Sequence, residues 1–279
     1  MNSSELFLQI RMKRSFLCVG LDPDYRKIPE TLRVQAGPDT LFEFNRQIIE
    51  ATAPYTVAYK LNTAFYEALG ITGWVNLKKT VEYLRAHYPE MFLIADAKRG
   101  DIGNTSALYA HAFFKQMDHD AITVNPYMGE DSVLPFLKYP GKWAIILAAT
   151  SNEGSADFQR MEDRYSGLKL FERVLEYSKN WGNEDNTMYV VGATRAELLK
   201  DIRNAVPNHF LLIPGVGAQG GSLREVSRNG MNDRCGLLVN SSRAILYADS
   251  SEKFAEAAGK KAEEMQQEMY VLLQQHYLM

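Results

Sequence analysis

Eight short apolar runs, separated along the chain by helix-like segments, are the feature that most constrains this fold. Several of them, such as FLIADAK and WAIILAATS, are apolar at consecutive positions instead of alternating. That pattern is typical of strands that are covered on both faces, as in parallel sheets. We expect strands over residues 16–22, 55–62, 92–98, 121–126, 143–151, 187–194, 210–217 and 236–242.

The segments between these runs have the apolar spacing of amphipathic helices. We expect helices over residues 39–53, 74–88, 106–117, 168–181 and 195–206, with Asp39 placed to cap the first of them. Residues 250–278 predict a long closing helix, and no heptad pattern persists there that would indicate a coiled coil.

Alternating strands and helices, without a linker or a shift in composition, predict one α/β domain over residues 1–279. A (β/α)8 TIM barrel takes about 250 residues, so a chain of 279 residues accommodates one with modest insertions. The longest irregular piece, residues 151–167, follows the fifth strand. A doubly wound open sheet is the alternative fold.

Composition and charge argue against several kinds of partner. The net charge is -3 on a mixed surface, which gives no electrostatic reason to expect nucleic acid or an anionic membrane as a partner. The longest strongly apolar run, residues 143–149, is too short to span a bilayer, and the first residues lack a signal-peptide core. Cys18 and Cys235 lie in apolar stretches, which is typical of buried free thiols in a reducing compartment. We therefore expect a soluble, cytoplasmic protein.

Polar side chains gather at one end of the predicted strands. They are Asp22, Lys60, Asn62, Asp96, Lys98, Asn125, Thr150, Ser151, Thr194 and the run from Asn240 to Arg243. Solvated loops would scatter polar residues over both ends of the strands. Because active-site groups of a barrel lie at the C-terminal ends of its strands, the pattern predicts a functional rim.

The stretch IADAKRGDIGNT carries the densest charge of this rim. Asp96 and Lys98 lie two apart, so on a regular strand their side chains leave the same face. Asp101 lies in the following turn, and Asn104 or Thr105 is placed to cap the next helix. Alternating carboxylates and ammoniums in a cleft hold one another ionised, which suits delivery of a proton to a carbon that gains negative charge. A surface ion-pair ladder is the alternative interpretation.

The glycine-rich stretch IPGVGAQGGS, residues 213–222, contains a formal GxGxxG. A dinucleotide fingerprint opens a βαβ unit and has an acid about 20 residues further on, whereas here the next strand ends in Asn240. The loops after strands seven and eight of a barrel form a phosphate site. The backbone N–H groups of this turn, with Gln219 and Arg243, therefore predict a phosphate site; a dinucleotide site and a plain turn are the alternatives.

These residues resemble the signature of the orotidine 5'-phosphate decarboxylase family. The motif D-x-K-x-x-D-I-x-x-T occurs here as Asp96, Lys98, Asp101, Ile102 and Thr105. Supporting matches cover most of the chain: Asp22 in VGLDPD, Lys60 in YKLN, Ser151 in ATSN, IPGVGAQGG, and Arg243 in NSSRA. The chain length and the sequences VGLDPD and GVGAQGG resemble those of the longer bacterial subgroup, type 2.

The resemblance implies a homodimeric barrel that converts orotidine 5'-phosphate to UMP and CO2, the last step of de novo pyrimidine synthesis, without metal or organic cofactor. Lys98 would protonate C6 of the pyrimidine and stabilise the carbanion. Asp96 would lie beside the departing carboxylate, and Lys60 and Asp101 would complete a Lys–Asp–Lys–Asp chain.

The resemblance also implies how the substrate is bound. Asp22 and Lys60 would hold the ribose hydroxyls, and Ser151 would bond the pyrimidine edge. Residues 214–222, beginning at Pro214, would close over the substrate. The phosphate would contact Gln219 and Arg243, and the active site of the neighbouring subunit would receive Asp101 and Thr105.

Three other functions fit the same barrel. A metal-dependent sugar-phosphate decarboxylase has a carboxylate at the second-strand position, whereas this chain has Lys60, which would repel Mg²⁺; the sequence also lacks a Cys/His cluster at metal-ligand spacing. A Schiff-base aldolase needs a neutral Lys98, whereas its acidic neighbours favour the protonated amine. A phosphate-ligand sensor without catalysis has no need of this charged array.

Overall fold

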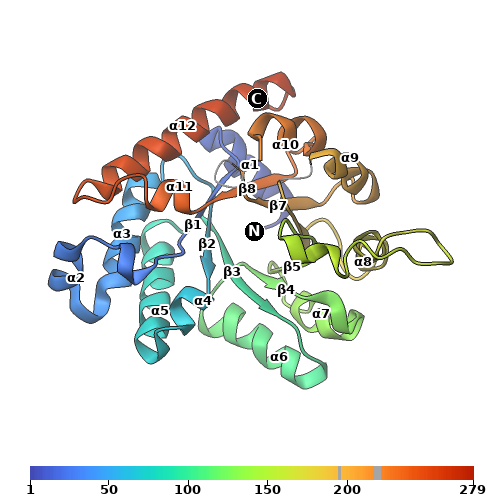
Figure 1. Ribbon diagram of the computed structural model, residues 1–279, viewed down its shortest axis with the longest axis horizontal. Helices are drawn as coiled ribbons and strands as arrows, with labels where there is room; N and C mark the ends of the chain where they lie inside the picture. Colours follow the sequence, from blue (N-terminus) through green and yellow to red (C-terminus); the bar gives the residue numbers. More distant parts are fainter. Residues whose placement is uncertain (194–195, 217–220) are drawn as a thin grey trace.

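The computed structural model describes residues 1–193, 196–216 and 221–279, and its eight strands close into one parallel barrel (Figure 1). The strands are β1 (Leu17–Gly20), β2 (Ala58–Asn62), β3 (Phe92–Arg99), β4 (Ala121–Val124), β5 (Trp143–Ala149), β6 (Thr187–Val191), β7 (Phe210–Pro214) and β8 (Leu237–Ser241). The predicted TIM barrel is confirmed. The doubly wound alternative is wrong, because β8 pairs with β1 and leaves no open edge.

Helices cover the outside of the barrel in chain order (Figure 1). Six of them match the predicted segments: α3 (Thr40–Thr52), α5 (Gly70–His87), α6 (Gly103–His111), α8 (Leu170–Ser178), α9 (Ala196–Ala205) and α12 (Phe254–Gln275). The sequence pattern did not predict α1 (Ser3–Lys13), α2 (Glu30–Ala36), α4 (Ala64–Glu67), α7 (Glu130–Leu137), α10 (Leu223–Gly230) or α11 (Arg243–Leu246). Most of these are short, and α7 contains Pro135, so each offers few turns over which an apolar repeat can be recognised.

Both capping predictions are wrong. Asp39 stands at the N-cap position of α3 but makes no capping hydrogen bond there; its carboxylate instead lies 2.7 Å from the Lys79 ammonium. Helix α6 begins earlier than predicted, with Ile102 at its N-cap position, so Asn104 and Thr105 lie inside its first turn. Gly103 allows this start because it adopts a φ of +51°.

The N-terminal end of the barrel is filled and covered. Phe92, Trp143 and Phe210 pack their rings together inside it, with centroid distances of 5.8 and 6.4 Å. The Trp143 indole N–H donates to the carbonyl of Met1 at 2.7 Å, which holds the chain terminus beside this aromatic cluster. The opposite end, where the strands finish, is where the barrel offers a cavity.

The closing helix α12 lies along the outside of the barrel (Figure 1). It packs against α3, α11 and β1, and the rings of Phe44 and Phe254 stack at 4.8 Å. Within the described residues, no helix has both the length and the apolar character needed to cross a membrane.

Candidate active site

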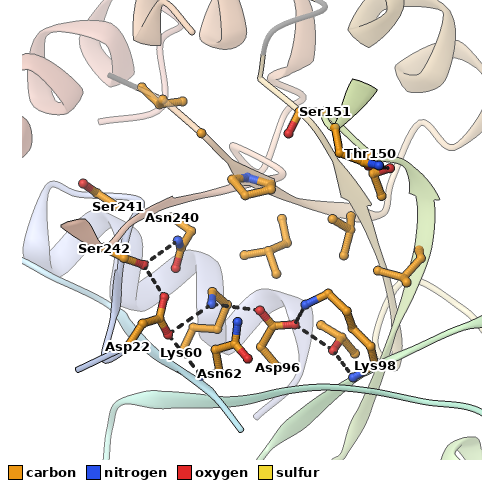
Figure 2. Close-up of a pocket in the computed structure, with 18 of the residues that line it drawn as sticks. Asp22, Lys60, Asn62, Asp96, Lys98, Thr150, Ser151, Asn240, Ser241 and Ser242 are labelled. Atoms are coloured by element: carbon orange, nitrogen blue, oxygen red, sulfur yellow. Dashed lines mark hydrogen bonds and ion pairs between the residues drawn. The ribbon is translucent and has the colours of Figure 1, made fainter. Parts of the chain in front are cut away.

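A cavity of about 370 Å³ opens at the C-terminal ends of the strands (Figure 2). Its walls combine a charged side, built from β1, β2 and β3, with an apolar side that includes Leu147, Val190 and Leu212. Strands β2 to β8 each contribute residues to the wall, and β1 contributes through Asp22, two residues after its end. The sequence-based prediction of a polar rim at this end of the barrel thus corresponds to a real cavity.

Four charged side chains form a continuous row along one wall, which we call the charged array: Asp22, Lys60, Asp96 and Lys98. The Lys60 ammonium lies 3.7 Å from Asp22 Oδ1 and 3.0 Å from Asp96 Oδ2. The Lys98 ammonium lies 2.6 Å from the other oxygen of Asp96. Figure 2 shows these contacts as dashed lines, with both lysine side chains directed at Asp96.

The charged array is not a surface ion-pair ladder. The side chains of Asp22, Lys60 and Asp96 are only 12%, 5% and 12% exposed, whereas that of Lys98 is 51% exposed. Three members are therefore held in the wall, and the fourth extends into the cavity with its ammonium accessible to a ligand.

Burial and charge act against each other in this array. Burial alone would raise the pKa of the Asp96 carboxyl, but the ammoniums of Lys60 and Lys98 hold that pKa well below its usual value of 3.8. Burial alone would lower the pKa of Lys60, but Asp22 and Asp96 raise it above its usual 10.5. Asp96 and Lys60 are consequently both ionised at neutral pH, and each fixes the position of the other.

Asp22 is oriented by two hydrogen bonds that the sequence reasoning missed. The Ser242 hydroxyl donates to Asp22 Oδ2 at 2.7 Å, and the Asn62 N–H donates to Asp22 Oδ1 at 3.1 Å. Gly20 provides the space for this contact, because a Cβ on Gly20 would lie 1.8 Å from the Ser242 hydroxyl oxygen. Ser242 belongs to the NSSRA motif, in which only Arg243 drew a functional assignment.

The chain leaves regular strand geometry at Lys98, which has a φ of +48°. The pairing of β3 with β4 shifts register between Ala95 and Arg99. The Lys98 N–H donates to the Thr123 hydroxyl at 2.9 Å, and that hydroxyl donates to Asp96 Oδ1 at 3.0 Å. The expectation that Asp96 and Lys98 project from one face of a regular strand is therefore wrong in its geometry, although their side chains do meet.

Predicted contacts to the pyrimidine edge and to the phosphate belong to the same cavity. Ser151, Pro214 and Arg243 all line it, and Arg243 is exposed at the start of α11. Gly215, which follows β7, has a φ of +93°, a conformation that favours glycine. The predicted contact Gln219 lies outside the described residues.

Two predicted site residues do not line this cavity. The Asp101 carboxylate accepts a hydrogen bond from the Ile102 N–H at 2.8 Å, and Thr105 is exposed on α6. Within one chain the charged array therefore runs from Asp22 to Lys98, and Asp101 does not belong to it.

The cavity offers no obvious place for a metal ion among its own acids. In the part of the chain that the structure describes, no group of three or more His, Cys, Asp or Glu side chains is arranged to hold one. The Lys60 ammonium lies between Asp22 and Asp96. It takes the position in which a cation shared by these carboxylates would have to bind.

The chain is similar in sequence to known proteins over most of its length. A sequence model of the Orotidine 5'-phosphate decarboxylase / HUMPS family matches residues 15–258. The chain is 60% identical, over 269 residues, to an orotidine 5'-phosphate decarboxylase of Phocaeicola vulgatus, covering 96% of this chain and 98% of the relative. It is 58% identical, over 269 residues, to one of Bacteroides fragilis, covering 96% of this chain and 97% of the relative.

Solved structures with the same architecture give a consistent result. An OMP decarboxylase of Leishmania donovani superposes with a TM-score of 0.80 at 35% identity, covering 97% of this chain and 99% of the other. A structure described as a putative orotidine-monophosphate decarboxylase of Toxoplasma gondii superposes with a TM-score of 0.83 at 33% identity, covering 97% and 98%.

Proposed function

Since this chain belongs to the orotidine 5'-phosphate decarboxylase family, we propose that its charged array is the catalytic centre and that Lys98 is the proton donor. The chain is a carbon–carbon lyase that converts orotidine 5'-phosphate to UMP and CO2 in pyrimidine synthesis. The observation that carries the residue assignment is the half-exposed Lys98 ammonium, fixed 2.6 Å from a carboxylate at the edge of a cavity.

The chemistry of the reaction explains why such an ammonium is needed. When CO2 leaves, the electron pair of the broken bond stays on C6 of the pyrimidine, which has no adjacent carbonyl to delocalise it. A fixed positive charge beside C6 stabilises the developing carbanion without reorganisation of solvent. Lys98 then transfers one proton from its ammonium to C6. Asp96 holds that ammonium in place, beside the departing carboxylate.

The remaining lining residues supply substrate contacts in this proposal. Asp22 and Lys60 hold the ribose hydroxyls, and Ser151 bonds the pyrimidine edge. Pro214 and the turn after it close over the substrate, with Gln219 and Arg243 on the phosphate. A guanidinium suits that role because it binds phosphate oxygens with two parallel hydrogen bonds.

We further propose that the enzyme works as a homodimer in which Asp101 and Thr105 enter the active site of the neighbouring subunit. Their placement outside the cavity of their own chain supports this. They also lie beside exposed apolar side chains on the neighbouring segments: Ile102, Leu108, Tyr109, Tyr127 and Met128. Large exposed apolar side chains in one region are typical of a protein–protein contact.

Two broader proposals concern the whole chain. Residues 1–279 act as one domain, because α12 packs on β1 and α3, and the first residues are bonded to the barrel through Trp143. A single cooperative unfolding transition would support this. The enzyme works in the cytoplasm, since Cys18 and Cys235 are buried free thiols, as expected in a reducing compartment.

The direct test follows the loss of orotidylate absorbance with the purified protein, with and without EDTA. We expect turnover in both conditions and formation of UMP. Loss of activity in EDTA would instead favour the metal-dependent sugar-phosphate type of reaction. The Lys98→Ala variant lacks the proposed proton donor. If Lys98 has that role, this variant must be inactive.

A further inference from the structure

One buried hydroxyl connects the two residues that the proposed mechanism depends on most. Thr123 is on β4 and only 1% exposed. Its hydroxyl accepts a hydrogen bond from the Lys98 N–H at 2.9 Å and donates one to Asp96 Oδ1 at 3.0 Å. The same oxygen of Asp96 accepts from the Lys98 ammonium at 2.6 Å. Thr123 thus contacts both the backbone of Lys98 and the carboxylate that positions its side chain.

The backbone explains why this contact is needed. On β3 and β4, Ala95 pairs with Ile122 and Arg99 pairs with Val124. Between these pairs, the three residues 96–98 of β3 face the single residue Thr123 of β4. This bulge removes the Lys98 N–H from the regular ladder, and the acceptor of its hydrogen bond becomes the Thr123 hydroxyl instead of a backbone carbonyl.

Lys98 also adopts a backbone conformation that L-residues rarely take, with a φ of +48°. Such a conformation persists only where the surroundings enforce it, and it is common at active sites. The bonds from Thr123 fix the two ends of the bulge, one at Asp96 and the other at Lys98.

Threonine has the properties that this position requires. A hydroxyl can accept one hydrogen bond and donate another at the same time, which neither an amide N–H nor a methyl group can do. Its β-branched side chain has few rotamers, so the oxygen stays in place. Valine has the same shape but offers neither bond.

We propose that Thr123 is a positioning residue for the proton donor. By bonding Asp96 and the Lys98 backbone, it keeps the Lys98 ammonium aimed into the cavity. Thr123 acts through Lys98 and Asp96, so this inference rests on the roles proposed for them above. A threonine retained only for packing would contribute to stability but not to the rate of the chemical step.

The test compares Thr123→Val with Thr123→Ser, measuring kcat and KM for orotidine 5'-phosphate, the affinity for UMP and the midpoint of thermal unfolding. We expect Thr123→Val to lower kcat by about 10- to 100-fold, because small misplacements of a reacting group cost that much. KM and UMP affinity should change by less than about threefold, since groups that act only on the chemical step leave ground-state binding intact. Thr123→Ser should restore most of kcat, because it restores the hydroxyl.

The matched control is Thr187→Val. Thr187 is also fully buried and its hydroxyl also donates a hydrogen bond, but it lies at the start of β6, away from the cavity. Thr187→Val should lower the unfolding midpoint and leave kcat unchanged. This comparison separates the loss of a buried hydroxyl from the loss of positioning.

Two results would overturn the inference. One is an unchanged kcat in Thr123→Val, whether or not KM rises, and the other is a loss of kcat in Thr123→Ser equal to that in Thr123→Val. Lys98→Ala, measured in parallel, separates this failure from failure of the proposed function. If Lys98→Ala retains turnover, the roles assigned to the charged array are wrong; if it is inactive while Thr123→Val is normal, only the role of Thr123 is wrong.

Discussion

Lys60 and Asp96, 36 positions apart in the chain, lie with their charged groups 3.0 Å from each other in the wall of the cavity. They meet because β2 and β3 pair in a register that sets Asn62 opposite Asp96. The pairing of neighbouring strands therefore builds the charged array, and Lys98 extends it into the cavity.

Replacing Lys98 by Ala should lower kcat by more than about 1000-fold, since proton transfer by a positioned group contributes up to about 10⁴-fold. UMP should still bind, because its phosphate and ribose contacts are elsewhere. Steady-state kinetics and calorimetric titration with UMP would measure both. The exposed Lys115 on the outer helix layer provides the control, and Lys115→Ala should behave as wild type. Near-normal turnover of Lys98→Ala would reject its assignment.

Replacing Arg243 by Ala should weaken ligand binding through the phosphate. We expect KM for orotidine 5'-phosphate to rise by about 10-fold or more, because a charge-assisted hydrogen bond is worth about 1.5–3 kcal/mol. The affinity for uridine, which has no phosphate, should not change. Arg11→Ala, an exposed site on α1, is the control. If UMP and uridine lost affinity equally, the phosphate contact would be misplaced.

Two subunit-mixing experiments test the shared active site. Lys98→Ala and Asp101→Asn are each expected to be inactive, but in a hybrid dimer one site carries both native residues. Random co-assembly makes half of the dimers hybrid, so activity should return to about 25% of wild type. Lys98→Ala with Lys60→Ala is the control, because both residues belong to the same site and no hybrid site is intact. If the mixture of Lys98→Ala with Asp101→Asn stayed as inactive as the control, the sharing of Asp101 would be contradicted.

The stability of the fold should fall as the pH falls below neutral because of two buried histidines. Burial lowers the pKa of His119 from 6.5 to about 3 and that of His209 from 6.5 to about 4. Neither ring has a hydrogen-bond partner among the described residues. A depressed pKa of a base means that the unfolded state takes up the proton first. The contribution of these two histidines to the free energy of unfolding is therefore fully present above pH 6.5. It is lost as the pH falls towards the pKa values that the two rings have in the folded protein.

At pH 5, each histidine should cost about 2 kcal/mol of unfolding free energy relative to neutral pH. Chemical denaturation at several pH values measures this dependence. His119→Leu should make the unfolding free energy depend less steeply on pH between 6.5 and 5, with the contribution of His209 remaining. His87→Gln, at an exposed site, should leave that dependence unchanged. A wild-type curve that is flat over this range would disprove the neutral, buried state of these rings.

Several charged residues of the cavity wall could be predicted from the sequence because they stand in short motifs. The motif from Asp96 to Thr105, with Asp22, Lys60 and Arg243, could be read without coordinates. The hydroxyls that orient the carboxylates could not. Ser242 lies 220 positions from Asp22 in the chain, and Thr123 lies 27 positions from Asp96.

The sequence alone determined the alternation of strands and helices and the identity of the charged groups, because apolar periodicity and short motifs act over a few neighbouring residues. The tertiary structure decided which of these groups meet. Closure of the barrel brings β8 beside β1 and so places Ser242 at Asp22. The shift in register between β3 and β4 places the Thr123 hydroxyl under Lys98. Strand pairing and register depend on the packing of the whole barrel, and no local pattern specifies them.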